Sequence, residues 1–214
     1  MNEKTRKLVA TAILSGIAVV MSFPFVGTLA LPLMPAAASI AFLPVMVAAI
    51  MLGFWPGVAV AIVAGAASLI RAFIIPTMMA PFFMNPLVSM IPRILVAITV
   101  WVVFNAMVKI AKDTKGAKIT VMAGISGAIG SIANTFFVLG SVYLFYAAPL
   151  ASDGGTLMSP SLSFQTDAFG LVGFTLFGVA TTNGLAELII NTILVAVLVT
   201  ALTKARFGRI FRSE

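Results

Sequence analysis

Three charged side chains, Arg71, Arg93 and Glu187, interrupt stretches of the sequence that are otherwise apolar. A charge inside a bilayer costs several kcal/mol unless it is paired or hydrated, so each of these residues marks a candidate buried site. Two arginines and one glutamate leave one surplus positive charge. A site of this kind suits a small anion, such as a monocarboxylate.

Polar residues accompany these charges at the spacing of a helix face. Ser131 and Asn134 share a face in one apolar stretch, and Ser68 lies three residues before Arg71 in another. Two more stretches have polar residues at positions i, i+4 and i+8, namely Asn85, Ser89 and Arg93 in one and Asn183, Glu187 and Asn191 in the other. The stripes predict a cavity open to the outside and lined by Arg71, Asn85, Ser89, Arg93, Ser131, Asn134, Asn183, Glu187 and Asn191.

The sequence also allows the three charged residues to have structural roles instead of binding a ligand. Arg71 could extend its guanidinium to the lipid headgroups, because long basic side chains near helix ends often do so. Glu187 could form an interhelical ion pair with one of the arginines. Arg93 lies about 10 Å along its predicted helix, too deep to reach the headgroups easily, so such a pair is its only structural alternative.

The composition places these residues in a polytopic membrane protein. Hydrophobic residues make up 61% of the 214 and only 9% are charged, against about a quarter in soluble domains. The chain has no cysteine, no histidine and no phosphate-binding G-x-x-x-x-G-K-[ST] loop. An intramembrane enzyme of the zinc, Ser–His or cysteine type is therefore excluded, and the sequence calls for no cofactor and no metal.

The apolar stretches predict an all-α fold of six transmembrane helices in a single domain over residues 1–214. Asn85 is a good N-cap and Pro86 suits the first position of the fourth helix. A membrane-edge segment at about 169–180 is expected before the last helix. The six predicted helices cover residues 8–29, 36–52, 58–75, 86–108, 119–146 and 183–203.

Basic residues predict the orientation of these helices. They gather before the first helix, between the fourth and fifth, and after the sixth, whereas the alternate loops carry only Asp153 and Asp167. By the positive-inside rule both termini are cytoplasmic. We expect the membrane to be the plasma membrane of a bacterium. The net charge of +7 is thus explained by topology, with anionic lipid as a further partner, and it requires no nucleic acid.

The basic start followed by an apolar run also resembles a secretory signal peptide. The apolar run from Leu8 is longer than the usual h-region of about 7–15 residues. We therefore expect the first helix to be retained as a transmembrane helix.

Small residues on the first helix form a second candidate surface. Thr11 with Ser15, and Ala12 with Gly16, have the small-xxx-small spacing that lets a second helix approach closely. This face serves either a partner protein or packing within the protein's own bundle.

Three stretches resemble one known family. "NPLVSMIPRILVAI" (85–98), "GAIGSIANTFFVLGSVYLF" (127–145) and "TTNGLAELIINTILV" (181–195) are similar to the S components of energy-coupling factor (ECF) vitamin transporters, and most to the pantothenate-type members. The similarity extends over essentially the whole chain.

The resemblance implies an S component that captures a scarce vitamin from outside the cell at high affinity. It would dock on a membrane coupling subunit driven by two cytoplasmic ATPases, with the small residues of the first helix at the interface. Ala12 and Gly16 match the two alanines of the family's motif only in size. Carried over by motif, the cavity residues are Asn85, Arg93, Asn134, Asn183 and Glu187.

Each alternative function requires features that can be looked for in the sequence. Within the same fold the ligand could be riboflavin, folate or cobalamin instead of pantothenate. A self-sufficient secondary transporter would be expected to show an inverted repeat and acidic residues for proton coupling, but no repeat is apparent and only Glu187 lies at membrane depth. An enzyme is disfavoured because there are also no paired carboxylates for acid–base chemistry.

Overall fold

The structure, a computed structural model, describes residues 2–23, 28–29, 38–75, 80–111, 117–147 and 168–204, with side chains left undescribed at 28–29, 38–39, 146–147 and 168–183. The described part is helical except for two short antiparallel strands, β1 (Thr28–Leu29) and β2 (Ala38–Ser39), in which Thr28 lies opposite Ser39. The helices are α1 (Glu3–Met21), α3 (Leu43–Met51), α4 (Phe54–Ile74), α5 (Ala80–Phe83), α6 (Pro86–Ala111), α7 (Ala117–Val142), its π-helical continuation η1 (Tyr143–Ala147), and α9 (Ala168–Lys204).

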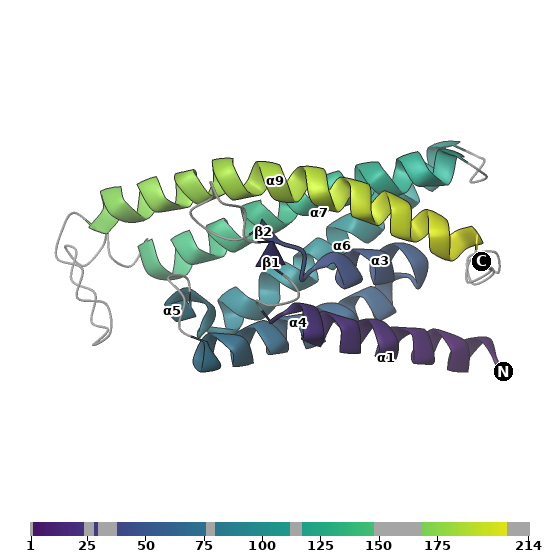
Figure 1. The fold of residues 1–214 in the computed structure, drawn as a ribbon, viewed down its shortest axis with the longest axis horizontal. Helices are drawn as coiled ribbons and strands as arrows, with labels where there is room; N and C mark the ends of the chain where they lie inside the picture. Colours follow the sequence, from purple (N-terminus) through teal and green to yellow (C-terminus); the bar gives the residue numbers. More distant parts are fainter. Residues whose placement is uncertain are drawn as a thin grey trace.

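The long helices run side by side along the long axis of the molecule (Figure 1). Four of the described helical segments are long and apolar enough to cross a membrane: Phe54–Ile74, Pro86–Ala111, Ala117–Phe145 and Gly184–Lys204. The prediction of an all-α polytopic membrane protein is confirmed.

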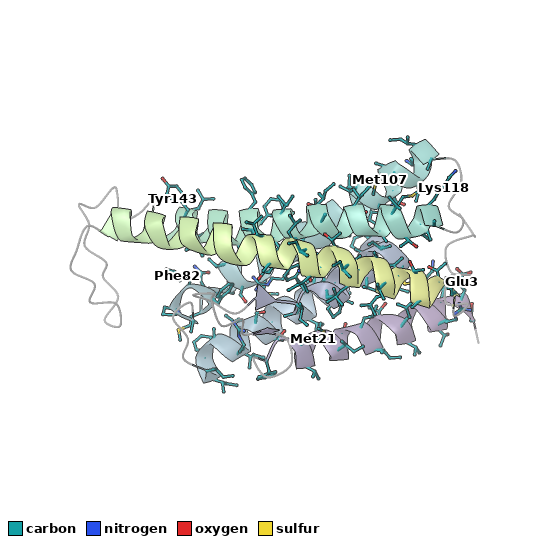
Figure 2. All side chains as sticks on the ribbon, turned by 45° about the horizontal axis from the view of Figure 1, so that its top comes forward. Glu3, Met21, Phe82, Met107, Lys118 and Tyr143 are labelled. Carbon is teal, nitrogen blue, oxygen red and sulfur yellow. The ribbon has the colours of Figure 1, made fainter. Side chains whose placement is uncertain are left out.

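The start of α1 and the end of α9 lie at the same end of the bundle (Figure 1). Figure 2 places Glu3 and Lys118 at this end and Phe82 and Tyr143 at the opposite one. The end of α6 and the start of α7 are thus on the same side as the start of α1 and the end of α9 (Figure 2). This is the end that the positive-inside rule predicts to be cytoplasmic, and we refer to the opposite end, which holds α5, as the outer end.

Two predicted helices are shorter in the structure than the apolar pattern indicated. The helix expected over 8–29 ends at Met21, and the one expected over 36–52 is reduced to α3. Prolines explain both limits, because Pro24 disfavours helical geometry just before it and Pro44 belongs in a first turn. With nine residues α3 is about 14 Å long, too short to cross the bilayer alone.

The last helix is longer than predicted. A membrane-edge segment was expected at 169–180, separate from a span over 183–203, whereas α9 runs unbroken for 37 residues, or about 56 Å. No proline occurs between Ala168 and Lys204 to stop it. The remaining three helices, α4, α6 and α7, lie close to their predicted ranges.

The short helix α3 forms the centre of the bundle. All nine of its residues are buried, and it contacts α1, α4, α6, α7 and α9. Met46, Val100 and Val195 belong to the core cluster that these helices share. Around this centre, α7 packs between α6 and α9, and α4 packs between α6 and α1. The three charged residues Arg71, Arg93 and Glu187 are therefore carried by α4, α6 and α9, which pack around this centre.

Helices α4 and α6 approach most closely at Gly65. A Cβ atom on Gly65 would lie 2.9 Å from the Cα atom of Met90, which is closer than real Cβ contacts allow. The same glycine accepts a hydrogen bond at its carbonyl oxygen from the buried Ser89 hydroxyl, at 2.9 Å. Glycine is thus required at position 65, because any side chain there would collide with the backbone of α6.

We expect Gly65→Ala to lower the free energy of unfolding by about 1–3 kcal/mol, because the added methyl group forces α4 and α6 apart. Gly140→Ala is the matched control, since a Cβ atom there would meet nothing within 4 Å. It should leave stability unchanged or raise it by up to about 1 kcal/mol, because glycine is a poor helix former. Thermal unfolding of both variants in detergent measures the difference, and equal effects would contradict the packing assigned to Gly65.

Candidate functional site

Arg93 lies in α6, whose start is fixed by Asn85 and Pro86. The Asn85 Oδ1 atom accepts a hydrogen bond from the Leu87 backbone N–H at 3.0 Å, so the predicted N-cap is confirmed. Helical side chains lean toward the N-terminus of their helix, which for α6 is the outer end. Accordingly the Arg93 guanidinium reaches back to α5, where its Cζ atom lies 5.0 Å from the centre of the Phe83 ring.

The guanidinium of Arg93 has unused hydrogen-bonding capacity. Its Nη1 atom is buried and has no hydrogen-bond partner among the described residues. Arg71 and Glu187 are close enough to interact with Arg93 electrostatically, one repelling and the other attracting it. No described carboxylate lies within the 4.0 Å of an ion pair with Arg93. The structure therefore brings the three predicted charges into one region without pairing Arg93.

The Arg71 guanidinium contacts another helix of the protein, so it does not only extend toward the lipid headgroups. Its Nη1 atom donates to the backbone carbonyl of Ser22 at 3.4 Å, at the residue that ends α1. A cation is favourable at this position because the C-terminus of a helix carries partial negative charge. Arg71 thus links α4 to the end of α1 and adds positive potential beside Arg93.

Helices α7 and α9 carry the other polar residues that were predicted to belong to the site. The Ser131 hydroxyl donates to the backbone carbonyl of Glu187 at 3.4 Å, and the Glu187 side chain is buried. On the same face of α7, Asn134 is buried and its Oδ1 atom has no partner among the described residues. Ser131 and Glu187 thus meet between α7 and α9, and Asn134 lies on the same face of α7 as Ser131.

Asn191 on α9 is fully buried, as are Ser89 and Ser126. It has no exposed surface, and neither its Nδ2 nor its Oδ1 atom has a described hydrogen-bond partner. An unsatisfied buried amide costs about 1–3 kcal/mol, so native proteins retain one where water or a ligand completes it. Arg93 and Asn134 likewise each have a buried polar atom without a described hydrogen-bond partner.

Two of the predicted site residues, Ser89 and Asn183, have no unpartnered side-chain atom that the structure describes. The hydroxyl of Ser89 is fully buried and donates to Gly65, so it joins α6 to α4 instead of facing a ligand. Asn183 belongs to α9, but its side chain lies outside the described residues.

Ser126 and Phe83 were missed by sequence reasoning. Ser126 is fully buried with an unpartnered hydroxyl, and it precedes Asn134 by eight residues on α7. This is the same i, i+8 spacing that identified Asn85 with Arg93, so the signal was present in the sequence. Phe83 gave no such signal, because its contact with Arg93 depends on how the short helix α5 folds back over α6.

A separate groove of about 550 Å³ lies between α7, η1 and α9. Its lining is apolar and includes Phe136, Tyr143 and Leu185, whose side chains are exposed on the surface of the bundle. Its described lining lacks the charged groups of the Arg93 region.

Comparison with known proteins identifies the family. The family model for the substrate-specific component of ECF transporters matches residues 6–199. The chain belongs to this family. It is therefore a substrate-binding S component and a multi-pass protein of the bacterial cell membrane, as the resemblance in the sequence implied.

Two individual proteins are similar to this S component. The pantothenic acid transporter PanT of Lactococcus lactis subsp. cremoris (strain MG1363) is 35% identical over 119 residues, which are 56% of this chain and 46% of the relative. The match thus spans about half of the relative's length. A solved structure of ThiT from Listeria monocytogenes superposes with a TM-score of 0.57 at 19% identity, covering 95% of this chain and 98% of that chain. The latter likeness supports the fold alone.

Proposed function

We propose that this S component binds pantothenate and presents it to an ATP-driven import complex. The observation that carries the proposal is the guanidinium of the half-buried Arg93, whose Nη1 atom is buried without a described hydrogen-bond partner, with Arg71 as a second cation nearby. A buried cation without a carboxylate partner is a site for an anionic ligand, and a guanidinium suits a carboxylate through two parallel hydrogen bonds. The similarity to a pantothenic acid transporter agrees with this chemistry.

The proposed binding site extends from Arg93 over the neighbouring helices. Asn134, Glu187 and Asn191 supply hydrogen-bonding groups from α7 and α9, and Asn183 is proposed as a further member from its sequence position. Arg71 strengthens the positive potential. Neutral vitamins such as riboflavin would leave Arg93 without the partner that its burial demands.

The partner surface is proposed to be the small-residue face of α1. Ala12 and Gly16 are exposed, and a Cβ atom on Gly16 would meet nothing within 4 Å. Thr11 and Ser15 are half-buried beside them. Because α1 packs on α4 through another face that includes Ala18, the face with Gly16 is available to a helix of the membrane coupling subunit.

Purification from native membranes tests the assignment to an import complex. A tagged S component is expected to co-purify with a membrane coupling subunit and two ATPases. In liposomes it should take up no pantothenate by itself and should do so when these subunits and ATP are added. Uptake by the chain alone would instead identify a secondary transporter.

A further inference from the structure

Phe83 is the aromatic residue that contacts the guanidinium of Arg93. The Arg93 Cζ atom lies over the Phe83 ring, 5.0 Å from its centre. A cation in this position is attracted by the negative charge on the ring face, and the attraction strengthens where water is excluded. Both side chains are half-buried in the bundle. The contact therefore restrains the charged end of Arg93.

The contact with the ring leaves the hydrogen-bonding capacity of Arg93 available. A guanidinium can stack its flat face on an aromatic ring while its N–H donors point outward in its own plane. The Nη1 atom of Arg93 is buried and has no hydrogen-bond partner among the described residues. A carboxylate binds a guanidinium through these in-plane donors. Phe83 and a carboxylate can thus contact Arg93 at the same time.

The position of the Phe83 ring is fixed by the turn between α5 and α6. Phe83 is the last residue of α5, and the backbone N–H of the next residue donates to the carbonyl of the buried Ala80 at 3.1 Å. Two residues after Phe83, the Asn85 side chain caps the start of α6. Because Arg93 belongs to the same helix, this turn holds the ring over the guanidinium.

Phe83 restrains Arg93 without neutralising it. An arginine side chain has high conformational entropy, and fixing it when a ligand binds reduces the affinity. Among the described residues no carboxylate forms an ion pair with Arg93, and Arg71 repels it. A neutral ring can order the guanidinium in advance and leave its charge for the ligand. This is the kind of preorganisation that raises affinity.

We propose that Phe83 is a positioning residue for the substrate, which holds the Arg93 guanidinium ready for the carboxylate of the ligand. This inference rests on the proposed function and adds a second residue to the recognition of the charge. Because Phe83 acts through Arg93, it should strengthen the binding of ligands that carry a carboxylate and not of ligands that lack one. A residue that only packs α5 on the bundle would affect both kinds of ligand alike.

Binding titrations of the purified full chain test this role with two probes, pantothenate and its alcohol analogue with CH2OH in place of the carboxylate. We expect Phe83→Leu to lower the affinity for pantothenate about 5- to 10-fold, because the attraction between the guanidinium and the ring is lost. The affinity for the alcohol analogue should stay the same. Phe83→Tyr keeps an aromatic ring and should bind both probes as the wild type does.

Phe136→Leu is the matched control for the loss of a phenyl ring. Phe136 is exposed on α7, and its ring lies 5.6 Å from that of Phe137, centre to centre. This variant should bind both probes with the affinities of the wild type.

A double-mutant cycle tests whether Phe83 acts through Arg93. Residues that act on a ligand through the same group are not additive in their effects. In a chain that already carries Arg93→Met, the change Phe83→Leu should therefore cause no further loss of affinity for pantothenate.

A fluorinated ring separates the attraction from packing, also if Phe83→Leu fails to fold. Trifluorophenylalanine at position 83 nearly keeps the shape of the ring, while its fluorine atoms withdraw the negative charge from the ring face. This variant should keep the unfolding temperature of the wild type. It should bind pantothenate more weakly and the alcohol analogue equally well.

The outcomes distinguish this role from the proposed function. If Phe83→Leu weakens both probes equally, or if it and the fluorinated variant bind pantothenate normally, the positioning role is wrong although the proposed function stands. A further loss of affinity in the chain with Arg93→Met also contradicts the role, because Phe83 would then act independently of Arg93. A wild-type chain that binds neither probe overturns the proposed function and the positioning role with it.

Discussion

Arg93→Met is expected to lower the affinity for pantothenate by at least about 100-fold. Removing one partner of a buried, hydrogen-bonded charge pair typically costs about 2–5 kcal/mol of binding free energy. In the ligand-free protein the same change removes a buried cation that has no ion-pair partner among the described residues. We therefore expect the unfolding temperature of the ligand-free variant to be equal to or higher than that of the wild type.

This opposite response of affinity and stability separates a binding role from a structural one. Isothermal titration gives the affinity, and thermal unfolding with and without pantothenate gives the stability. Arg93→Lys is the informative companion, because it keeps the charge but loses the planar fork of donors, and it should bind with intermediate affinity. A variant that unfolds more easily without ligand, or that binds normally, would show that Arg93 does not anchor the substrate.

Gly16→Leu is expected to leave pantothenate binding unchanged and to reduce uptake by the assembled complex at least about tenfold. Gly16 is exposed on α1, and a Cβ atom there would meet nothing within 4 Å. A leucine there keeps a helix of the coupling subunit from approaching closely, and overpacking of this kind costs about 1–3 kcal/mol.

Gly140→Leu is the control for this prediction, because Gly140 on α7 also has open space around its Cβ position but lies outside the proposed interface. Uptake into proteoliposomes that contain the coupling subunit and ATPases compares the two variants at matched protein levels. Equal uptake by both would contradict a docking role for the face with Gly16. A loss of vitamin binding in Gly16→Leu would instead indicate damage to the fold.

The sequence predicted the helices well where local chemistry marks their ends. Asn85 and Pro86 are a cap and a first-turn residue, and α6 begins where they predicted. The apolar stretch up to Leu29 carries no charge, so hydropathy alone extended the first helix past Met21. Hydropathy reports solubility in lipid, whereas proline geometry and tertiary contacts decide where a helix ends, as α3 shows.

The buried polar residues of the candidate site were predictable where a charge or amide is costly in lipid. Arg93, Glu187 and Asn191 could be found this way, because burial of such groups requires a reason. The contact from Arg71 to Ser22 could not, since it joins residues 49 positions apart. Ser89 was predicted to line the cavity together with Asn85 and Arg93. Only the structure shows that its hydroxyl points at Gly65 instead.

The central claim is that this S component holds an anionic vitamin at Arg93, whose buried Nη1 atom has no described hydrogen-bond partner. Its most direct test is a titration of the purified wild-type chain with pantothenate and with the alcohol analogue that lacks the carboxylate. The account predicts saturable binding of pantothenate at one site and at least about 100-fold weaker binding of the alcohol. Equal binding of the two compounds, or no binding of pantothenate, would contradict it.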